Sequence, residues 1–197
     1  MTKLLFSLFL VASMTLTAQA GIQSNGDGVK VSPTASKVEW IGRKVTGKHN
    51  GTINIKEGQI KVQDGFLTGG SVIIDMTSIR NLDMTGEYAA KLENHLKSDD
   101  FFSADAYPTA TLVITQANAK GNGQYDVKAN LTIKGATHPI SFNTQLTPEG
   151  KKYKAVANIT IDRSLYNVKY GSGKFFEGLG DKTIYDEFDL TITLVTE

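Results

Sequence analysis

The residues of this chain that could take part in chemistry are few and scattered. The three histidines are His49, His95 and His138, and no two of them stand at the spacing of a metal site. The chain has no cysteine, which excludes disulfides, thiolate metal ligands and lipid attachment through a cysteine. The sequence therefore predicts no metal site.

Known catalytic and nucleotide-binding motifs are also missing. Gly173-Lys174 looks like the end of a phosphate-binding loop, but Val168 replaces its first glycine and Phe175 replaces the Ser or Thr that would bind magnesium. There is no Gly-x-Ser-x-Gly motif and no dinucleotide fingerprint. We expect no catalytic residue and no cofactor.

Two charged pairs are the remaining polar candidates. Asp99-Asp100 are adjacent in a turn, so their carboxylates point apart and a capping role is favoured over paired acid–base chemistry. Asp162-Arg163 end a strand, and we interpret them as an exposed ion pair of little energetic value. The alternative is that Arg163 clamps the pyrophosphate of a ligand head group.

Most of the chain alternates apolar and polar residues with the period of two that is typical of a half-buried β-strand. The clearest runs are 125–133, 153–161 and 188–194, and shorter runs cover 38–40, 53–55, 72–76, 109–115 and 140–142. Asn50-Gly51 indicates a turn before Ile53. About eight strands predict a single antiparallel barrel or sandwich, and the last strand is expected to close it against an early one.

One short helix interrupts this pattern. The segment 83–85 is expected to cap it, and it should run to about Lys97 with Tyr88, Leu92 and Leu96 on one apolar stripe. The turn that follows contains Phe101-Phe102, of which at least one should be buried. A lone helix in a β-rich chain usually closes or supports one end of a barrel.

The N-terminal sequence and the balance of charges indicate where the protein is located and what it binds. Residues 1–20 have a basic start, an apolar stretch and an Ala-Gln-Ala cleavage site, which predicts a signal peptide and an exported, periplasmic protein. A flexible leader over 21–32 and one domain over 33–197 are expected to follow, with no transmembrane span after cleavage. The 21 basic and 20 acidic residues nearly cancel, so nothing suggests a nucleic-acid partner.

Three separated segments resemble the signature segments of the YceI family: HLKSDDFF, YPTATLVIT and LTIKGATHPISF. The resemblance covers about Val31 to Thr196. It implies an exported, lipocalin-like barrel that binds a polyisoprenoid lipid or an isoprenoid quinone, and it allows a homodimer.

Small residues on two strands would leave room for such a ligand. With this resemblance, the predicted ligand-binding residues are Trp40, Ala129, Leu131, Phe142, Ala155, Ala157 and Ile159 inside the barrel. His95 would offer a polar contact at one end. Phe175 and Phe176, on the glycine-punctuated segment 170–182, would form a lid, although they could equally cover the edge of the core.

Two alternatives remain at this point. An envelope enzyme acting on a lipid would need two of His49, His95, Asp162 and Arg163 within hydrogen-bond reach in the cavity. A stress-response interaction module would have a solid core, in which neighbours such as Phe142 fill the space.

Overall fold

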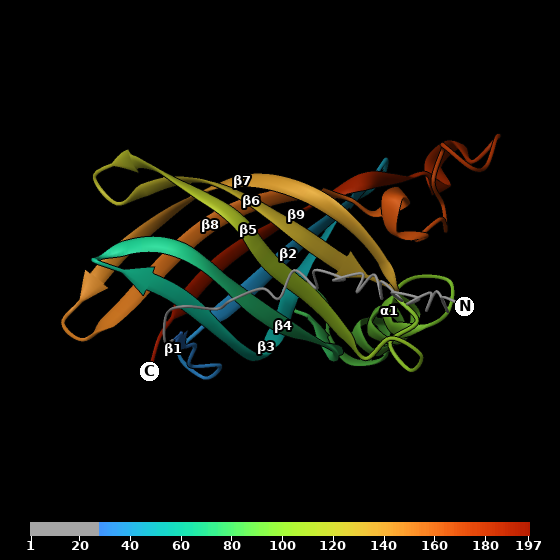
Figure 1. Cartoon of the computed structure of the whole chain (residues 1–197). Coiled ribbons are helices and arrows are strands. Elements are labelled where there is room, and N and C mark those ends of the chain that lie inside the picture. The colour runs from blue at the N-terminus through green and yellow to red at the C-terminus, as the bar shows by residue number, and fades with distance from the viewer. Residues whose placement is uncertain (1–27) are drawn as a thin grey trace, which may run out of the picture.

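The computed structural model describes residues 28–197, which form an eight-stranded antiparallel barrel with one helix (Figure 1). Each strand from β2 onward pairs with the next one in the chain, and β9 returns to pair with β2. The predicted closure by the last strand is thus confirmed. The barrel strands are β2 (Lys37–Lys44), β3 (Gly47–Gln63), β4 (Phe66–Asn81), β5 (Thr109–Gly121), β6 (Gln124–Ile133), β7 (Ala136–Glu149), β8 (Lys152–Asp162) and β9 (Ile184–Val195).

The period-two pattern places alternate side chains inside the barrel. Along β6, the odd-numbered residues from Tyr125 to Ile133 are buried, while the polar residues between them face outward. Because each strand has one wet face and one apolar face, hydrophobic burial fixes which face turns inward. The interior is the single hydrophobic core of the described chain.

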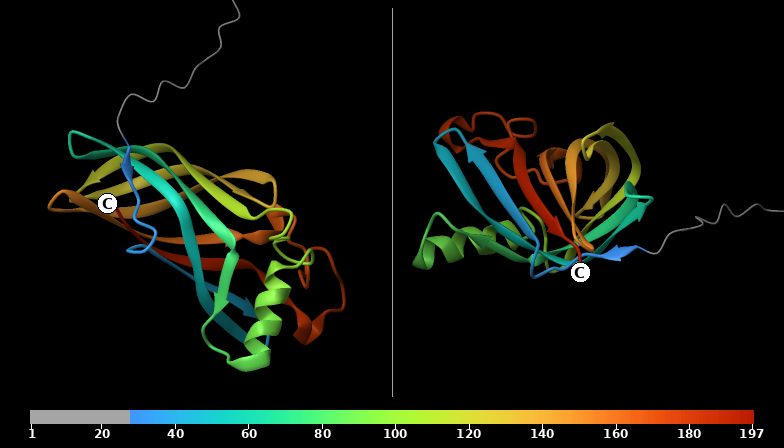
Figure 2. Two further views of the ribbon diagram at one scale, coloured as in Figure 1. Left: turned by 90° about the horizontal axis from the view of Figure 1, so that it is seen from below. Right: turned by 90° about the vertical axis from the view of Figure 1, so that its left-hand side faces the viewer.

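The two ends of the barrel differ (Figure 2). One end carries β1 (Val29–Lys30), the C-terminus and the turns after β3, β5 and β7. The other end carries helix α1 (Gly86–Lys97), the short helices η1 (Arg163–Tyr166) and η2 (Gly180–Lys182), and the loop 167–183. We call this second end the helical end.

Only the second half of helix α1 covers the barrel. Of the three residues on the predicted apolar stripe, Leu92 and Leu96 line the barrel cavity, whereas Tyr88 is 74% exposed. Only the C-terminal turns of the helix contact the barrel end, and its first turns project beyond it (Figure 2). Thr85 occupies the N-cap position, as expected, but makes no side-chain capping hydrogen bond.

The aromatic turn after α1 is anchored, as the sequence predicted. Phe101 is buried, and the backbone carbonyls of Asp99 and Phe101 both accept hydrogen bonds from Lys134 Nζ at 2.8 Å. Asp100 lies 3.5 Å from His95 Nε2. The two aspartates therefore serve the turn and do not form a paired-carboxylate site.

Asn50-Gly51 does not form the predicted turn. Both residues lie within β3, and the hairpin turn falls earlier, at residues 45–46. Gly51 stands opposite Trp40, and a Cβ at this position would lie only 2.5 Å from the indole ring. The backbone carbonyl oxygen of Arg80 would lie closer still. The close approach of Arg80 and Trp40 therefore requires the glycine, a reason that Asn-Gly turn statistics do not contain.

The ladder between β7 and β8 is incomplete. Their pairing runs from Glu149↔Lys152 to Thr144↔Ala157 and stops there. Beyond that point residues 136–143 pair only with β6, and residues 158–162 pair only with β9. We call this unpaired stretch the β7–β8 seam; it lies toward the helical end, where His138 of β7 packs edge-on against Tyr166 of η1 at 5.2 Å.

Part of the segment expected to be a flexible leader belongs to the barrel. Val29 and Lys30 form β1, which pairs with β3, and Val31 is buried. The predicted signal peptide, residues 1–20, and the leader residues 21–27 lie outside the described part of the chain.

Candidate functional site: an apolar cavity inside the barrel

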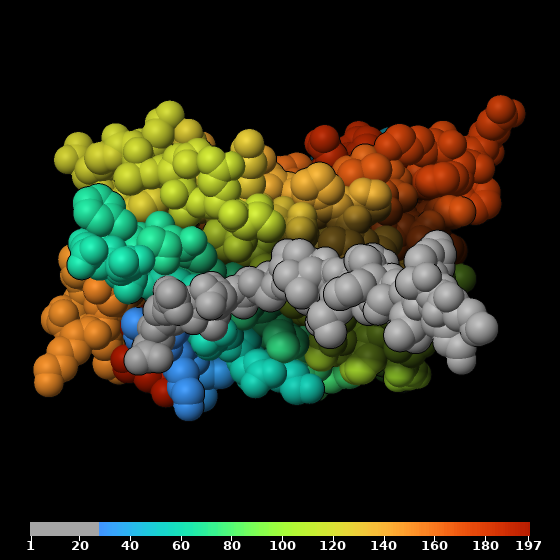
Figure 3. Space-filling model, viewed as in Figure 1, coloured from blue at the N-terminus to red at the C-terminus, as the bar shows by residue number. Residues whose placement is uncertain are grey.

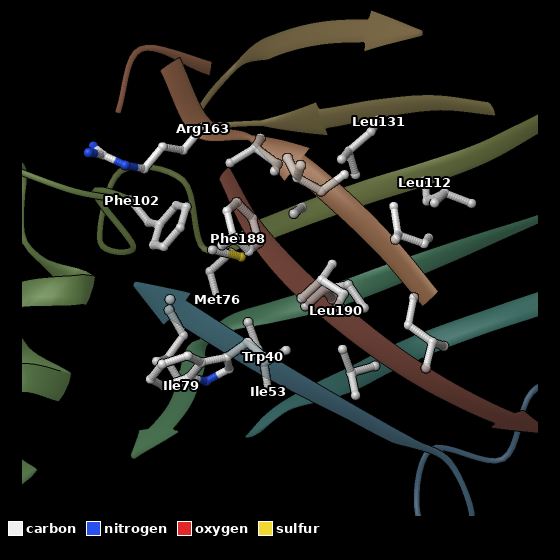
Figure 4. A pocket seen from close by; sticks show the side chains of 18 of the residues that line it. Trp40, Ile53, Met76, Ile79, Phe102, Leu112, Leu131, Arg163, Phe188 and Leu190 are labelled. Atoms are coloured by element: carbon white, nitrogen blue, oxygen red, sulfur yellow. The ribbon is translucent and has the colours of Figure 1, made fainter. Parts of the chain in front are cut away.

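A cavity of about 550 Å³ occupies the barrel interior (Figure 4). This volume falls in the range of about 300–1,000 Å³ that is usual for small-ligand sites. All eight barrel strands contribute inward apolar side chains to it, among them Trp40, Ile53, Met76, Leu112, Leu131 and Leu190. A solid core is therefore wrong for this barrel.

Most of the residues predicted to contact a ligand border this cavity. They are Trp40, Leu131, Phe142, Ala155, Ala157 and Ile159 from the strands and His95 from α1. Their shared inward direction follows from the alternation that the sequence showed. Whether they touch a ligand stays a prediction.

Three of the predicted residues do not border the cavity. Ala129 is buried but lies behind the lining, paired with Ile114 on one side and Ile140 on the other. Phe175 and Phe176 are 43% and 50% exposed on the loop 167–183, and neither borders the cavity. Alternation alone cannot separate an inward residue that is covered by its neighbours from one that faces free space.

Several lining residues were not singled out from the sequence. Met76 and Ile79 line the cavity near α1, and Phe188 and Leu190 line it from β9. The period-two pattern placed Met76, Phe188 and Leu190 on inward faces, so the signal was available for them. Ile79 lies in a part of β4 that the sequence pattern did not assign to a strand.

The cavity reaches solvent at the helical end, and at the β1 end its lining combines buried apolar side chains with the exposed Gln59. At the end that carries β1, its lining side chains Ile60, Leu67 and Leu194 are buried. At the helical end, the exposed residues Lys44 and Lys182 border it. We call this opening the mouth; its rim is polar, while the interior behind it is apolar.

Trp40 is the only tryptophan in the chain and faces the cavity. Its indole Nε1 donates a hydrogen bond to the Thr52 carbonyl at 3.2 Å, so the polar atom of the ring is satisfied on the neighbouring strand. The apolar part of the ring is then free to contact a ligand, and the indole can report on what enters the cavity.

His95 sits at the mouth among aromatic rings. Its imidazole packs edge-on against Phe101 at 5.1 Å and against Tyr170 at 4.5 Å. The helix α1, the aromatic turn and the loop 167–183 therefore meet at this histidine. It is the one predicted polar contact that borders the cavity.

Arg163 is buried at the helical end, which corrects our interpretation of it as an exposed ion pair. Its side chain is 3% exposed and donates hydrogen bonds to the carbonyls of Val168 at 2.8 Å, Ile184 at 3.0 Å and Tyr185 at 3.1 Å. Its guanidinium also lies over the Phe101 ring at 5.5 Å and 3.4 Å from Asp186. Burial lowers the pKa of Arg163, with Asp186 and Asp162 opposing that change.

This bonding pattern makes Arg163 a structural anchor for the loop 167–183. A buried arginine is stable only where its donors are paired, and here backbone carbonyls from both ends of the loop supply the acceptors. Asp162 turns the other way and pairs with Lys174 Nζ at 3.0 Å. The alternative role for Arg163, a clamp for a head-group pyrophosphate, is disfavoured because most of its donors are already used.

The polar residues do not converge into a catalytic arrangement. His49 borders the cavity, but its Nδ1 lies 2.8 Å from Asp83, and among residues 28–197 no hydrogen bond joins any two of His49, His95, Asp162 and Arg163. In the same residues no three metal-ligating side chains cluster. What the geometry offers is apolar enclosure with a polar rim.

No helix within residues 28–197 has the length and apolar character to cross a bilayer.

A family model and several proteins of related sequence match this chain. The model of the YceI-like domain matches residues 30–196. A UPF0312 protein of Vibrio cholerae is 34% identical over 101 residues, and the chain spans about half the length of that relative, 51%. A UPF0312 protein of Shewanella baltica is 27% identical over 155 residues, covering 77% of this chain and 76% of that protein.

Solved structures share the fold. The crystal structure of Burkholderia cenocepacia BcnA superposes with a TM-score of 0.70 at 23% identity, covering 85% of this chain and 99% of that one. A polyisoprenoid binding domain from Saccharophagus degradans superposes with a TM-score of 0.64 at 16% identity, covering 85% of this chain and 97% of that one. At these identities the likeness establishes the barrel fold alone.

Proposed function

The chain belongs to the YceI-like family, and from that premise we propose that it binds an isoprenoid lipid in its barrel. The observation that carries this proposal is the apolar cavity of about 550 Å³, which opens through a polar rim at the helical end. The structural likeness to a domain described as polyisoprenoid binding supports the same ligand class. The protein's role is then binding and carriage, with no chemical step.

The energetics of such binding need only apolar contact. Each methylene taken out of water contributes about 0.8 kcal/mol. A few isoprene units therefore outweigh an association cost of several kcal/mol and give micromolar or tighter binding. The polar rim would leave a head group in water, while the tail lies against Trp40, Leu112 and Leu190.

We further propose that the protein is exported to the periplasm and carries its lipid through water between membranes. The support for export is the signal-like pattern of residues 1–20. A largely apolar interior lined by buried side chains suits a carrier, because it shields an apolar tail from water.

Two measurements on the purified mature protein test the binding. Native mass spectrometry of the gently purified protein should show an adduct that extraction with organic solvent identifies as an isoprenoid. Titration of an isoprenoid quinone into the delipidated protein should quench the fluorescence of Trp40, because a quinone ring or tail that enters the cavity meets the only indole.

A matched control separates entry into the cavity from adsorption at the surface. A saturated fatty alcohol that carries no quinone should compete with the quinone and restore the Trp40 fluorescence. If the quench is linear in quinone without saturation, and no lipid co-purifies, the isoprenoid proposal fails.

A further inference from the structure

The exposed large apolar side chains of residues 28–197 are concentrated at the helical end. All of them except Phe66 and Val113 lie there, in the β2–β3 turn, the segment after β4, α1, the turn before β5, η1, the loop 167–183 and the start of β9. Scattered surface apolar residues are ordinary, but their collection around one opening indicates an interaction surface.

The most prominent members of this surface sit on two neighbouring projections. The β2–β3 turn carries Val45, whose backbone N–H donates to the Thr183 carbonyl at 3.0 Å, so this turn and the loop 167–183 are side by side. The loop projects past the barrel end in the ribbon and space-filling views (Figures 1 and 3). It carries Phe175 and Phe176, each about half exposed.

Basic side chains accompany these apolar tips. The turn from 43 to 48 contains Arg43, Lys44 and Lys48 and no acidic residue. Arg43 pairs with Asp189, whereas within residues 28–197 no ion pair joins Lys44 or Lys48. On the loop, Lys169 Nζ lies 5.0 Å from the centre of the Phe175 ring. Aromatic rings beside lysines are the combination that suits the boundary between water and an anionic bilayer.

We propose that the helical end of the barrel docks on the surface of an anionic lipid bilayer. Phe175 and Phe176 enter the head-group region, where their rings leave water, and Lys44 and Lys48 meet lipid phosphates. The mouth then faces the bilayer. If the barrel carries an isoprenoid, as proposed above, this orientation lets the lipid pass between bilayer and cavity without crossing water; the docking itself does not depend on that ligand.

Vesicle co-sedimentation of the mature protein tests the docking directly. The vesicles are phosphatidylcholine alone, or phosphatidylcholine with phosphatidylglycerol, and neither contains an isoprenoid. We expect binding to the phosphatidylglycerol vesicles that weakens as salt screens the lysines. The double variant F175S/F176S should lower the partition coefficient at least about tenfold, because two rings no longer leave water.

Two further variants complete the design. K44E/K48E, on the exposed turn, should reduce binding to phosphatidylglycerol vesicles. If F175S/F176S does not fold, this variant alone tests the docking. F66S is the matched control, because Phe66 is also exposed but lies at the opposite end of the barrel. It should bind vesicles like the wild type. Thermal melts check that each variant is folded.

Several results would overturn the docking. They are an absence of co-sedimentation with either vesicle type, an equal loss of binding in F66S, and unchanged binding in both F175S/F176S and K44E/K48E. A dimer in size-exclusion chromatography that F175S/F176S converts to a monomer, with vesicle binding unchanged, would assign this surface to a second copy of the chain. Because the vesicles lack isoprenoids, failure of the lipid-binding proposal would leave this measurement unaffected.

Discussion

Replacing Ala157 with Phe separates a ligand cavity from a packed core. Ala157 borders the cavity from β8, so the new ring would extend into free space. A dry cavity that accommodates a benzene ring has a volume of about 150 Å³. The ring would thus take roughly a quarter of the 550 Å³ that the structure provides.

The expected stability change is small, since nothing has to move. The free energy of unfolding of delipidated Ala157→Phe should stay within about 1 kcal/mol of wild type, because a phenyl ring in free apolar space creates no overpacking. The ring would occupy part of the apolar space that a ligand tail would need. Co-purifying lipid should therefore fall sharply in this variant.

Ala129 supplies the matched control. It is 1% exposed, against 7% for Ala157, and it does not border the cavity. A Phe at this position must displace its packed neighbours, which typically costs about 1–3 kcal/mol. From the sequence alone the two alanines are equivalent, so only the structure predicts that they differ.

Urea unfolding of both delipidated variants, with mass spectrometry of co-purifying lipid, measures these effects. Equal destabilisation of Ala157→Phe and Ala129→Phe would mean that the space beside Ala157 is filled in solution. Full lipid content in a stable Ala157→Phe would mean that the ligand lies elsewhere. Either result would refute our account of the cavity.

Four further outcomes are expected. Arg163→Met should lower the free energy of unfolding by about 3 kcal/mol in urea titration, because three buried carbonyls lose a charged donor; a change below about 1 kcal/mol would contradict the anchoring role. Phe101→Ala should cost about 3–5 kcal/mol, whereas the exposed control Phe66→Ala should stay within about 0.5 kcal/mol. Partial burial raises the pKa of Asp162, but hydrogen bonds from Ser164 and Lys174 outweigh it and hold the pKa below its usual value. The carboxylate therefore contributes stability above the unfolded-state pKa of about 3.9, which is lost as pH falls through the lower folded-state value; acid unfolding of Asp162→Asn should show a shallower loss, and an unchanged acid limb would exclude this contribution. The intact mass of the exported protein should correspond to a chain that starts at Gly21, and a mass that retains residues 1–20 would disprove cleavage.

The barrel was predictable because its signal is local and repeated. Strands such as β6 and β8 alternate strictly, and alternation with one apolar face leaves few folds other than a closed or stacked antiparallel sheet. The end of the helix and its aromatic turn were predictable because their signals are also local. Ser98, which ends the helix, and Phe101, which anchors the turn, lie close together in the sequence.

The errors concern contacts between distant segments. Arg163 looked exposed because its neighbour in sequence is an aspartate, yet its acceptors come from residues 168, 184 and 185. Gly51 looked like a turn residue because the groups that exclude a side chain there, the Arg80 carbonyl and the Trp40 ring, belong to other strands. Phe175 and Phe176 looked like lid residues because sequence does not reveal the direction in which a glycine-rich loop projects.

The β7–β8 seam bears on how large a guest this barrel can accept. A fully laddered barrel has a circumference fixed by its hydrogen bonds, and enlarging it means breaking a row of them. No ladder bonds join residues 136–143 to residues 158–162, so the wall can stretch there by parting only side-chain contacts. Ile140 and Phe142 on one edge and Ile159 and Ile161 on the other already border the cavity. If the barrel binds an isoprenoid as proposed, the volume of about 550 Å³ is a lower bound on its capacity, because widening at the seam would make room for longer tails.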